Sequence, residues 1–252
     1  MITPGLSDRE QKIISAVASE NGISIQKLSK IIGVSTVTIR SDLNSLTEKG
    51  IVMRTRGGVT PTFNTSVLQR QQIMFEEKNR IAQAAAEMIR EGDTVMVEAG
   101  TTTALIGKYL LGKWNIRIVT NSLLIIPYLR INPGVQLCMV GGDFRPFSET
   151  FVGPMALDQL ENFHVRFAFV GTDGFSVEHG FTSHMMEAAE IVRKMAEQAE
   201  TVVLLADSSK YGKKGFASAL PITGVKKLIT DQGLDQKTIE SIIATGVDVL
   251  AV

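Results

Sequence analysis

The apolar positions of residues 1–60 repeat at helical spacing. They predict three short helices: one from a cap at Ser7 up to residue 21, one at about 24–31, and one from a cap at Ser35 to about 48. Two short β-prone segments, 51–54 and 58–60, flank a turn and predict a small two-stranded wing.

The pattern changes after a polar segment, 61–77, which we interpret as a linker, and a helix predicted at 78–91. Short apolar runs then alternate with helical segments. The predicted strands are 94–98, 116–120, 135–140, 166–171, 201–206, 226–230 and 247–251, and the predicted helices are 102–112, 122–131, 154–161, 184–199 and 234–244. Because the strands are continuous apolar runs, they predict a mainly parallel α/β sheet that is buried on both faces.

Composition is that of an ordinary globular chain of 252 residues, with 44% hydrophobic residues. The single cysteine, Cys138, excludes a disulfide framework and a cysteine-based zinc site. It lies in the apolar run 135–140, so we expect a small buried side chain. The chain has neither a secretory signal pattern nor an apolar run of about 18 residues, which favours a cytoplasmic protein without a membrane partner.

Charge is distributed unevenly although the net charge is zero. Residues 1–60 carry 8 Lys and Arg against 5 Asp and Glu, a balance of 8 − 5 = +3, whereas residues 61–252 carry 18 against 21, a balance of 18 − 21 = −3. A basic front joined to an acidic body predicts two domains with different partners.

The first three helices and the wing fit a winged helix-turn-helix. The second helix of the helix-turn-helix unit lies in the DNA major groove, and here that is the helix predicted from Ser35 to about 48. If Ile39, Leu43 and Leu46 face the core, the opposite side presents the candidate DNA-binding residues Ser35, Thr36, Val37, Thr38, Arg40, Ser41 and Asn44. Arg40 suits a guanine or a phosphate, and Arg54 and Arg56 on the wing suit the DNA backbone or minor groove. The alternative is a three-helix bundle for protein contacts in which Arg40 is a solvated surface charge.

Polar turns follow five of the predicted strands, where the ligands of open α/β sheets bind. The candidate effector-binding residues at these turns are Glu98, Gly100, Thr101, Thr102, Thr103, Thr120, Asn121, Ser122, Gly141, Gly142, Gly171, Asp173, Gly174 and Lys210; His179 and Glu187 complete the set. Each turn alone is explained by helix capping. Together their hydroxyls, carboxylates and ammonium suit a small polyhydroxylated anion.

Several of these strings resemble the DeoR family of bacterial transcriptional regulators. At the front the pattern Ser-x-x-Thr-Ile-Arg-x-Asp-Leu at 35–43 is followed by a Gly-Gly wing. In the body the likeness is carried by residues 100–103, 119–123, 140–142, 152–154, 169–174, 179–182 and 205–211. Two positions depart from the usual pattern: Ser41, where many members have a second Arg, and Glu98, where Asp is more usual.

The resemblance implies a double-stranded DNA operator and a sensor domain that is similar in fold to ribose-5-phosphate isomerase and binds phosphorylated sugars. It predicts a repressor of carbohydrate genes, with an activator as the alternative, that acts as a homo-oligomer, either dimer or tetramer. The domain prediction is 1–60 for DNA binding, 61–77 for the linker, and 78–252 for effector binding and oligomerisation.

The isomerase likeness also raises an enzyme hypothesis, a sugar-phosphate isomerase with an appended DNA-binding domain. Asp173 and Glu187 could supply carboxylates. In the isomerases that the sensor domain resembles, a Lys lies between the corresponding acidic residues, whereas the stretch 167–192 of this chain contains no Lys or Arg. We therefore expect binding without turnover. The three histidines show no metal-ligand spacing and there is no nucleotide-binding glycine motif, so we expect no metal and no cofactor.

Overall fold

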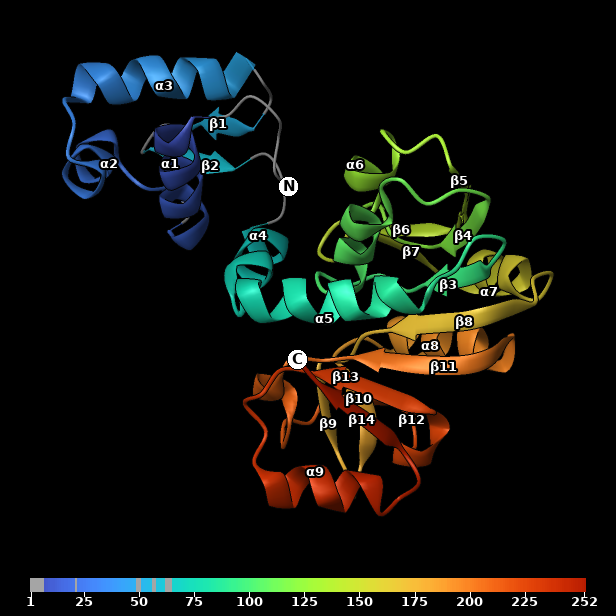
Figure 1. The fold of residues 1–252 in the computed structure, drawn as a ribbon. Coiled ribbons are helices and arrows are strands. Elements are labelled where there is room, and N and C mark those ends of the chain that lie inside the picture. Colours follow the sequence, from blue (N-terminus) through green and yellow to red (C-terminus); the bar gives the residue numbers. More distant parts are fainter. Residues whose placement is uncertain (1–6, 21, 49–50, 56–57, 62–64) are drawn as a thin grey trace. The chain divides into compact units, whose positions relative to one another are not determined.

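The computed structural model describes residues 7–20, 22–48, 51–55, 58–61 and 65–252, which form two compact units (Figure 1). The first unit runs to Ile73 and includes residues 146–148; the second runs from Met74 to Val252 without those three residues.

The first unit holds the three predicted helices and the wing. Its elements are α1 (Asp8–Ser19), α2 (Ile25–Ile32), α3 (Thr36–Glu48), β1 (Val52–Arg54), β2 (Val59–Pro61) and α4 (Thr65–Gln72). Strands β1 and β2 pair antiparallel. A core of apolar side chains from all three helices and the wing holds the unit together: Ile13, Val17, Ile23, Leu28, Ile39, Leu43, Leu46, Ile51, Val52 and Val59. Helix α4 lies within the segment that we interpreted as a linker.

The second unit is built on a seven-stranded parallel sheet. All seven predicted strands are present: β3 (Thr94–Val97), β4 (Ile116–Thr120), β5 (Val135–Met139), β8 (Val165–Val170), β11 (Ala199–Leu205), β13 (Lys227–Thr230) and β14 (Asp248–Ala251). Their order is β14-β13-β11-β8-β3-β4-β5, and every neighbouring pair is parallel. The chain moves outward from β3 to β5 and then returns to β8 on the other side of β3. The order in which strands are added to the sheet therefore reverses between β3 and β8, and this junction is the switch point of the sheet.

The helices of the second unit are α5 (Phe75–Met88), η1 (Thr103–Leu110), α6 (Ile126–Leu129), α7 (Pro154–Leu160), α8 (Met186–Glu197), η2 (Ser208–Lys210), η3 (Ile222–Gly224) and α9 (Gln236–Ile243), of which the η elements are 3-10 helices. Two differ from the sequence prediction. The predicted helix at 102–112 is a 3-10 helix, and the one at 122–131 is a single turn. Pro127 lies in the first turn of α6, where its ring and its missing N–H do not allow the helix to begin a turn earlier.

Five short antiparallel strands were not predicted. They are β6 (Asp143–Arg145), β7 (Thr150–Val152), β9 (Gly174–Ser176), β10 (Gly180–Ser183) and β12 (Ala217–Leu220). Strands β6 and β7 form a hairpin, and β12-β10-β9 form a small separate sheet. Residues 146–148, between β6 and β7, belong to the first unit, where the Arg70 guanidinium donates to the Phe147 carbonyl (3.2 Å) and lies 5.3 Å from the centre of its ring.

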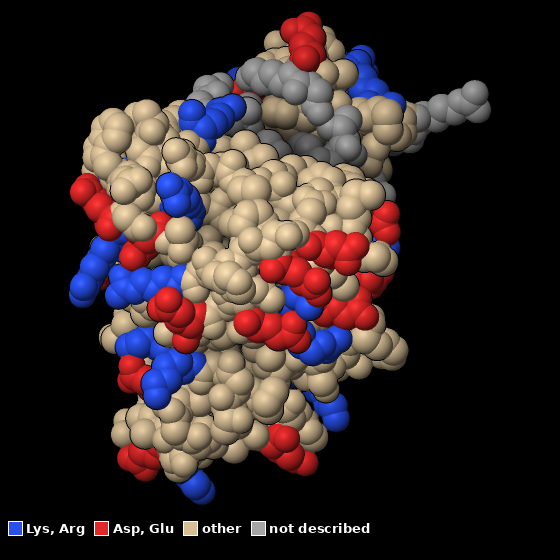
Figure 2. Space-filling view, turned by 90° about the vertical axis from the view of Figure 1, so that its right-hand side faces the viewer, with Lys and Arg blue, Asp and Glu red and all other residues tan. Residues whose placement is uncertain are grey.

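The edge strand β5 corrects one expectation. Gln136, Leu137 and Cys138 are consecutive and all exposed, so β5 is not buried on both faces and Cys138 is not a buried side chain. Figure 2 views the protein from the side on which β5 lies in Figure 1, and the upper part of that face has a broad area without charged side chains.

Candidate DNA interface and effector site

Helix α3 is oriented by its buried face. Ile39, Leu43 and Leu46 are fully buried in the core of the first unit. The opposite face carries predicted DNA-binding residues, and Thr36, Val37, Arg40, Ser41 and Asn44 are all exposed there. Val37 is 75% exposed, which is unusual for a branched apolar side chain and suits contact with a thymine methyl group.

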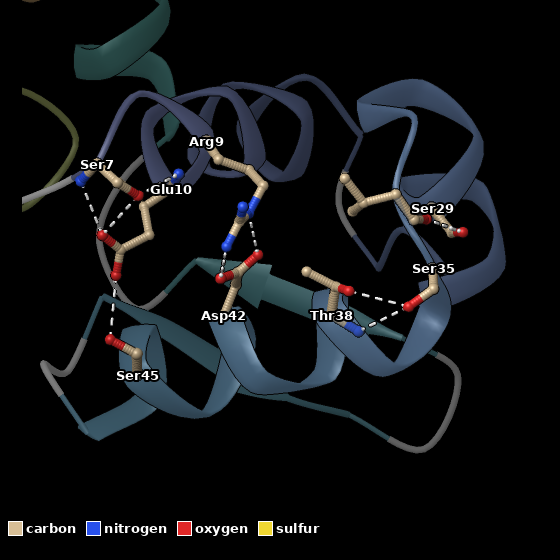
Figure 3. Close-up of polar contacts among 9 residues, drawn as sticks. Ser7, Arg9, Glu10, Ser29, Ser35, Thr38, Asp42 and Ser45 are labelled. Atoms are coloured by element: carbon tan, nitrogen blue, oxygen red, sulfur yellow. Dashed lines mark hydrogen bonds and ion pairs between the residues drawn. The ribbon is translucent and has the colours of Figure 1, made fainter.

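The start of α3 is capped by Ser35. The Ser35 hydroxyl accepts the Thr38 N–H (3.1 Å) and lies 2.9 Å from the Thr38 hydroxyl (Figure 3). At the preceding turn the Ser29 hydroxyl donates to the Val34 carbonyl, 2.5 Å away. These bonds set the length of the turn between α2 and α3, so Thr38 serves the cap and is half-buried, whereas Thr36 and Val37 are free to face DNA.

A polar frame joins α1 to α3, and sequence reasoning missed it. Arg9 donates to both carboxylate oxygens of Asp42, at 2.7 and 2.9 Å, and this pairing raises the pKa of the Arg9 guanidinium. Glu10 closes the predicted capping box with Ser7 and also accepts the Ser45 hydroxyl at 3.0 Å (Figure 3). Two parallel bonds fix orientation as well as distance, so the exposed face of α3 is held in one direction.

The side chain of Arg54, at the end of β1, contacts α3 directly. Its guanidinium donates to the Asn44 side-chain oxygen (2.7 Å) and to the Arg40 carbonyl (3.3 Å). The sequence placed Arg54 on the DNA backbone or minor groove; these bonds give it the further task of joining the wing to α3. Arg56 lies outside the described residues.

Some of the predicted effector residues lie together at the ends of β3 and β8, where the strand order reverses. Glu98 follows β3 and is buried, and its carboxylate accepts the Gly171 N–H, which follows β8, at 3.1 Å. A Cβ at Gly171 would lie 3.3 Å from that carboxylate, and one at Gly100 would lie 2.8 Å from the Thr103 hydroxyl. In parallel α/β sheets such a switch point, outside the carboxyl ends of the strands, is where ligands bind.

Four of the predicted polar side chains hold these strand ends together. The Thr103 hydroxyl donates to the Glu98 carbonyl (2.7 Å) and the Thr120 hydroxyl to the Val97 carbonyl (2.5 Å). The Asn121 amide donates to the Thr150 hydroxyl (2.7 Å), and Ser122 accepts an N–H from within its own turn. All four are buried and are engaged in these internal bonds, so they shape the site rather than offer groups to a ligand.

Two glycines shape the turn after β5. Gly142 has a φ of +143°, and a Cβ there would lie 2.6 Å from the Val152 carbonyl. Gly141 donates its N–H to the Gln159 side chain at 3.1 Å. Both glycines therefore determine the backbone conformation of this turn.

Fewer of the predicted polar side chains remain available to bind a ligand. Among the described residues, the Thr101 and Thr102 hydroxyls have no hydrogen bond and the Lys210 ammonium has no ion pair. Asp173 accepts the Ser183 hydroxyl (3.1 Å) and the His184 N–H (2.8 Å). Gly174 packs against the Lys213 carbonyl, which brings the loop after β8 to the loop that contains η2.

Two further predicted residues lie at other contacts. His179 is exposed, with its ring 3.7 Å from the Glu178 carboxylate, and no described contact joins it to another predicted effector residue. Glu187, at the start of α8, pairs with Arg145 of β6 at 3.1 Å. Its own backbone N–H, and then Arg145, lower the pKa of the Glu187 carboxyl. Sequence reasoning missed Arg145, because β6 carries no strong apolar signal.

Family comparison agrees with both units. The DeoR-like helix-turn-helix domain matches residues 9–65, and the DeoR C terminal sensor domain matches residues 73–232. The chain belongs to the DeoR family. It is therefore a DNA-binding transcriptional regulator with a winged helix-turn-helix and an α/β sensor domain.

Similar regulators match the DeoR-family chain over nearly its whole length. The HTH-type transcriptional regulator GlpR of Haloferax volcanii is 32% identical over 251 residues, 97% of each chain. The HTH-type transcriptional repressor GlcR of Bacillus subtilis is 31% identical over 247 residues, 96% of this chain and 95% of that one.

Among solved structures, D-ribose-5-phosphate isomerase in complex with phospho-erythronic acid matches with 20% identity and a TM-score of 0.40, over 54% of each chain. Within the described part of this DeoR-family chain, no helix has the length and apolar character needed to cross a membrane.

Proposed function

We propose that this DeoR-family protein represses genes of carbohydrate metabolism and leaves its operator when it binds a phosphorylated sugar. The observation that carries the DNA half of the proposal is the exposed face of α3. Val37, Arg40 and Ser41 point away from a core that the opposite face fills completely. Helices held in this way read base edges in the major groove.

Arg40 is the proposed base-reading cation, with guanine as the best-fitting partner. Asn44 contributes differently. Because Arg54 occupies its side-chain oxygen, Asn44 has only its amide hydrogens to offer, which suits an acceptor on a base rather than the paired donor and acceptor of adenine.

A phosphorylated sugar fits the switch point between β3 and β8. The Thr101 and Thr102 hydroxyls can donate to phosphate or sugar oxygens, and Lys210 supplies positive charge. Glu98, Gly100 and Gly171 lie at the same junction, where the two glycines leave room for the Thr103 hydroxyl and the Glu98 carboxylate. The Glu98 carboxylate can accept hydrogen bonds from sugar hydroxyls, while the Thr101 and Thr102 hydroxyls and the Lys210 ammonium can donate to the phosphate, so these groups favour a phosphorylated sugar over an apolar ligand.

The proposed site binds its ligand without converting it. An isomerase needs a mobile base and a cation that stabilises the enediolate. The Asp173 carboxylate instead accepts two internal hydrogen bonds, and the segment 167–192 carries no Lys or Arg. Conversion of any sugar phosphate at an enzymic rate would contradict this part of the proposal.

Assembly of two or more copies completes the proposal. A balance of +3 over residues 1–60 neutralises few phosphates, so one copy binds DNA weakly. Two copies on spaced half-sites bind more tightly. The ligand then acts by preferring the state in which that spacing does not match the operator.

The DNA half is tested with Arg40→Ala. Specific operator binding is expected to be lost while sugar-phosphate binding is unchanged, as measured by fluorescence anisotropy and thermal shift. Arg90→Ala is the matched control, because Arg90 is an exposed arginine outside the DNA-reading helix. Equal losses in both variants would mean that Arg40 acts only as bulk charge.

The effector half is tested by a thermal-shift screen against pentose and hexose phosphates, since a ligand that binds only the native state raises Tm. The double variant Thr102→Ala, Lys210→Ala is then expected to keep DNA binding but lose the response. Lys214→Ala, an exposed lysine of the same loop, should keep it. A double variant that still responds would remove both residues from the site.

A further inference from the structure

The outer edge of β5 lacks the features that usually protect an edge strand from pairing with another chain. Natural edge strands are blunted by charges, prolines or bulges, because an open edge pairs with other chains. β5 has the sequence Val-Gln-Leu-Cys-Met, with no charge and no proline, and within the described chain it pairs only with β4. The opposite edge, β14, begins with Asp248, which is ion-paired to Lys227 of β13.

Apolar exposure at β5 extends over both faces and into the turns at its start. Leu137 and Cys138 are neighbours on a strand and so point to opposite faces, and both are exposed. The adjoining turns expose three more large apolar side chains, at 57–64% of their surface: Leu111, Trp114 and Ile131.

These turns contact one another directly. The Asn132 side chain donates to the Leu110 carbonyl (2.7 Å), and a Cβ at Gly134 would lie 2.2 Å from the Lys113 carbonyl. These contacts hold the two turns together beside the start of β5.

We propose that a second copy of this chain covers this surface, with the two β5 strands antiparallel across a two-fold axis. A two-fold contact presents the same patch from both partners, and an uncharged strand meets itself without like-charge repulsion. The two strands would pair about Leu137, joining both sheets into one. The inference rests on the assembly required by the proposed function and adds where that assembly occurs.

Leu137→Lys tests the surface, and Leu250→Lys is its matched control. Both leucines lie on edge strands at opposite ends of one sheet, and they are 38% and 37% exposed. Leu137→Lys places like charges face to face, which is expected to weaken dimerisation by about 100-fold or more. Sedimentation equilibrium over a range of concentrations measures the change; Leu250→Lys should dimerise like the natural chain.

Cys138 provides a second test that needs no disruptive variant. It is the one cysteine of the sequence, so any cysteine-to-cysteine cross-link joins two copies through this position. In the proposed pairing the two Cys138 residues are diagonal neighbours, about 8 Å apart. A short bismaleimide should therefore cross-link the unmodified dimer efficiently.

Three results would overturn the inference: a natural chain that is monomeric at all concentrations, dimerisation that Leu137→Lys leaves intact, or a dimer that does not cross-link at Cys138. Recovery of a different protein on this edge with no self-association would do so as well. None of these results bears on the loss of operator recognition expected for Arg40→Ala on a single half-site. A monomeric natural chain would also contradict the assembly step of the proposed function, whereas a dimer that survives Leu137→Lys or does not cross-link at Cys138 would contradict the interface alone, so the two failures are distinguishable.

Discussion

Replacement of Leu43 by alanine is expected to unfold the first unit and leave the second unit folded. Leu43 is fully buried in the core of the first unit, together with nine other apolar side chains. Removing three buried carbon atoms and leaving a cavity costs about 2–5 kcal/mol. The core of a unit of 73 + 3 = 76 residues supplies only about 3–5 kcal/mol of net stability, so the loss is comparable to the whole.

Differential scanning calorimetry measures this directly. A unit of this size loses about 4–8 °C in Tm for each kcal/mol, so the transition of the first unit should fall by about 10 °C or more. Operator affinity should fall in proportion to the folded fraction of the first unit. Binding of a sugar phosphate should not change.

Leu204→Ala is the matched control, because Leu204 is a fully buried leucine in the core of the second unit. It should lower only the other transition. A single transition that moves as a whole in both variants would refute the reasoning, since it would mean that the two cores unfold as one.

Three further outcomes are expected. Arg54→Met, which removes the bond from the wing to α3, should change base preference at one operator position in a binding-site selection; an unchanged preference would limit Arg54 to backbone contact. Arg145→Met should raise the pKa of Glu187 part of the way to its ordinary value, as measured by carboxyl NMR titration; the stability that the lowered pKa contributes is present above the ordinary pKa and is lost as pH falls through the folded value. Gly142→Ala should destabilise the second unit by about 1–3 kcal/mol in urea unfolding, because its φ is positive and a backbone oxygen lies where the Cβ would be, whereas Gly141→Ala should change little.

The sequence predicts the frame of both units because their apolar periods are clear. The helix-turn-helix follows from the stripe of Ile39, Leu43 and Leu46, and the seven parallel strands follow from continuous apolar runs. The short antiparallel strands are missed because three or four residues with polar or glycine positions give no period to detect. The order of the strands, and with it the switch point, depends on contacts far apart in sequence.

Side-chain roles are harder to predict than strand ends. Thr101, Thr102, Thr103 and Thr120 are equivalent as sequence, yet the last two are consumed by backbone carbonyls. The exposure of Cys138 could likewise not be predicted, because an apolar run has the same sequence pattern in a central strand and in an edge strand. These distinctions arise from tertiary neighbours, which local composition does not encode.

The bond between Arg54 and Asn44 has a consequence for how operator specificity can diverge. If residue 44 is replaced by one that cannot accept a hydrogen bond from Arg54, the Arg54 guanidinium becomes available for another contact. If Arg54 is replaced, the side-chain oxygen of Asn44 becomes available to accept a hydrogen bond from a base. Either change alters two contacts at once. Among descendants of this chain, positions 44 and 54 should therefore mutate as a pair, and a new operator sequence should be reached by double replacements more readily than by single ones.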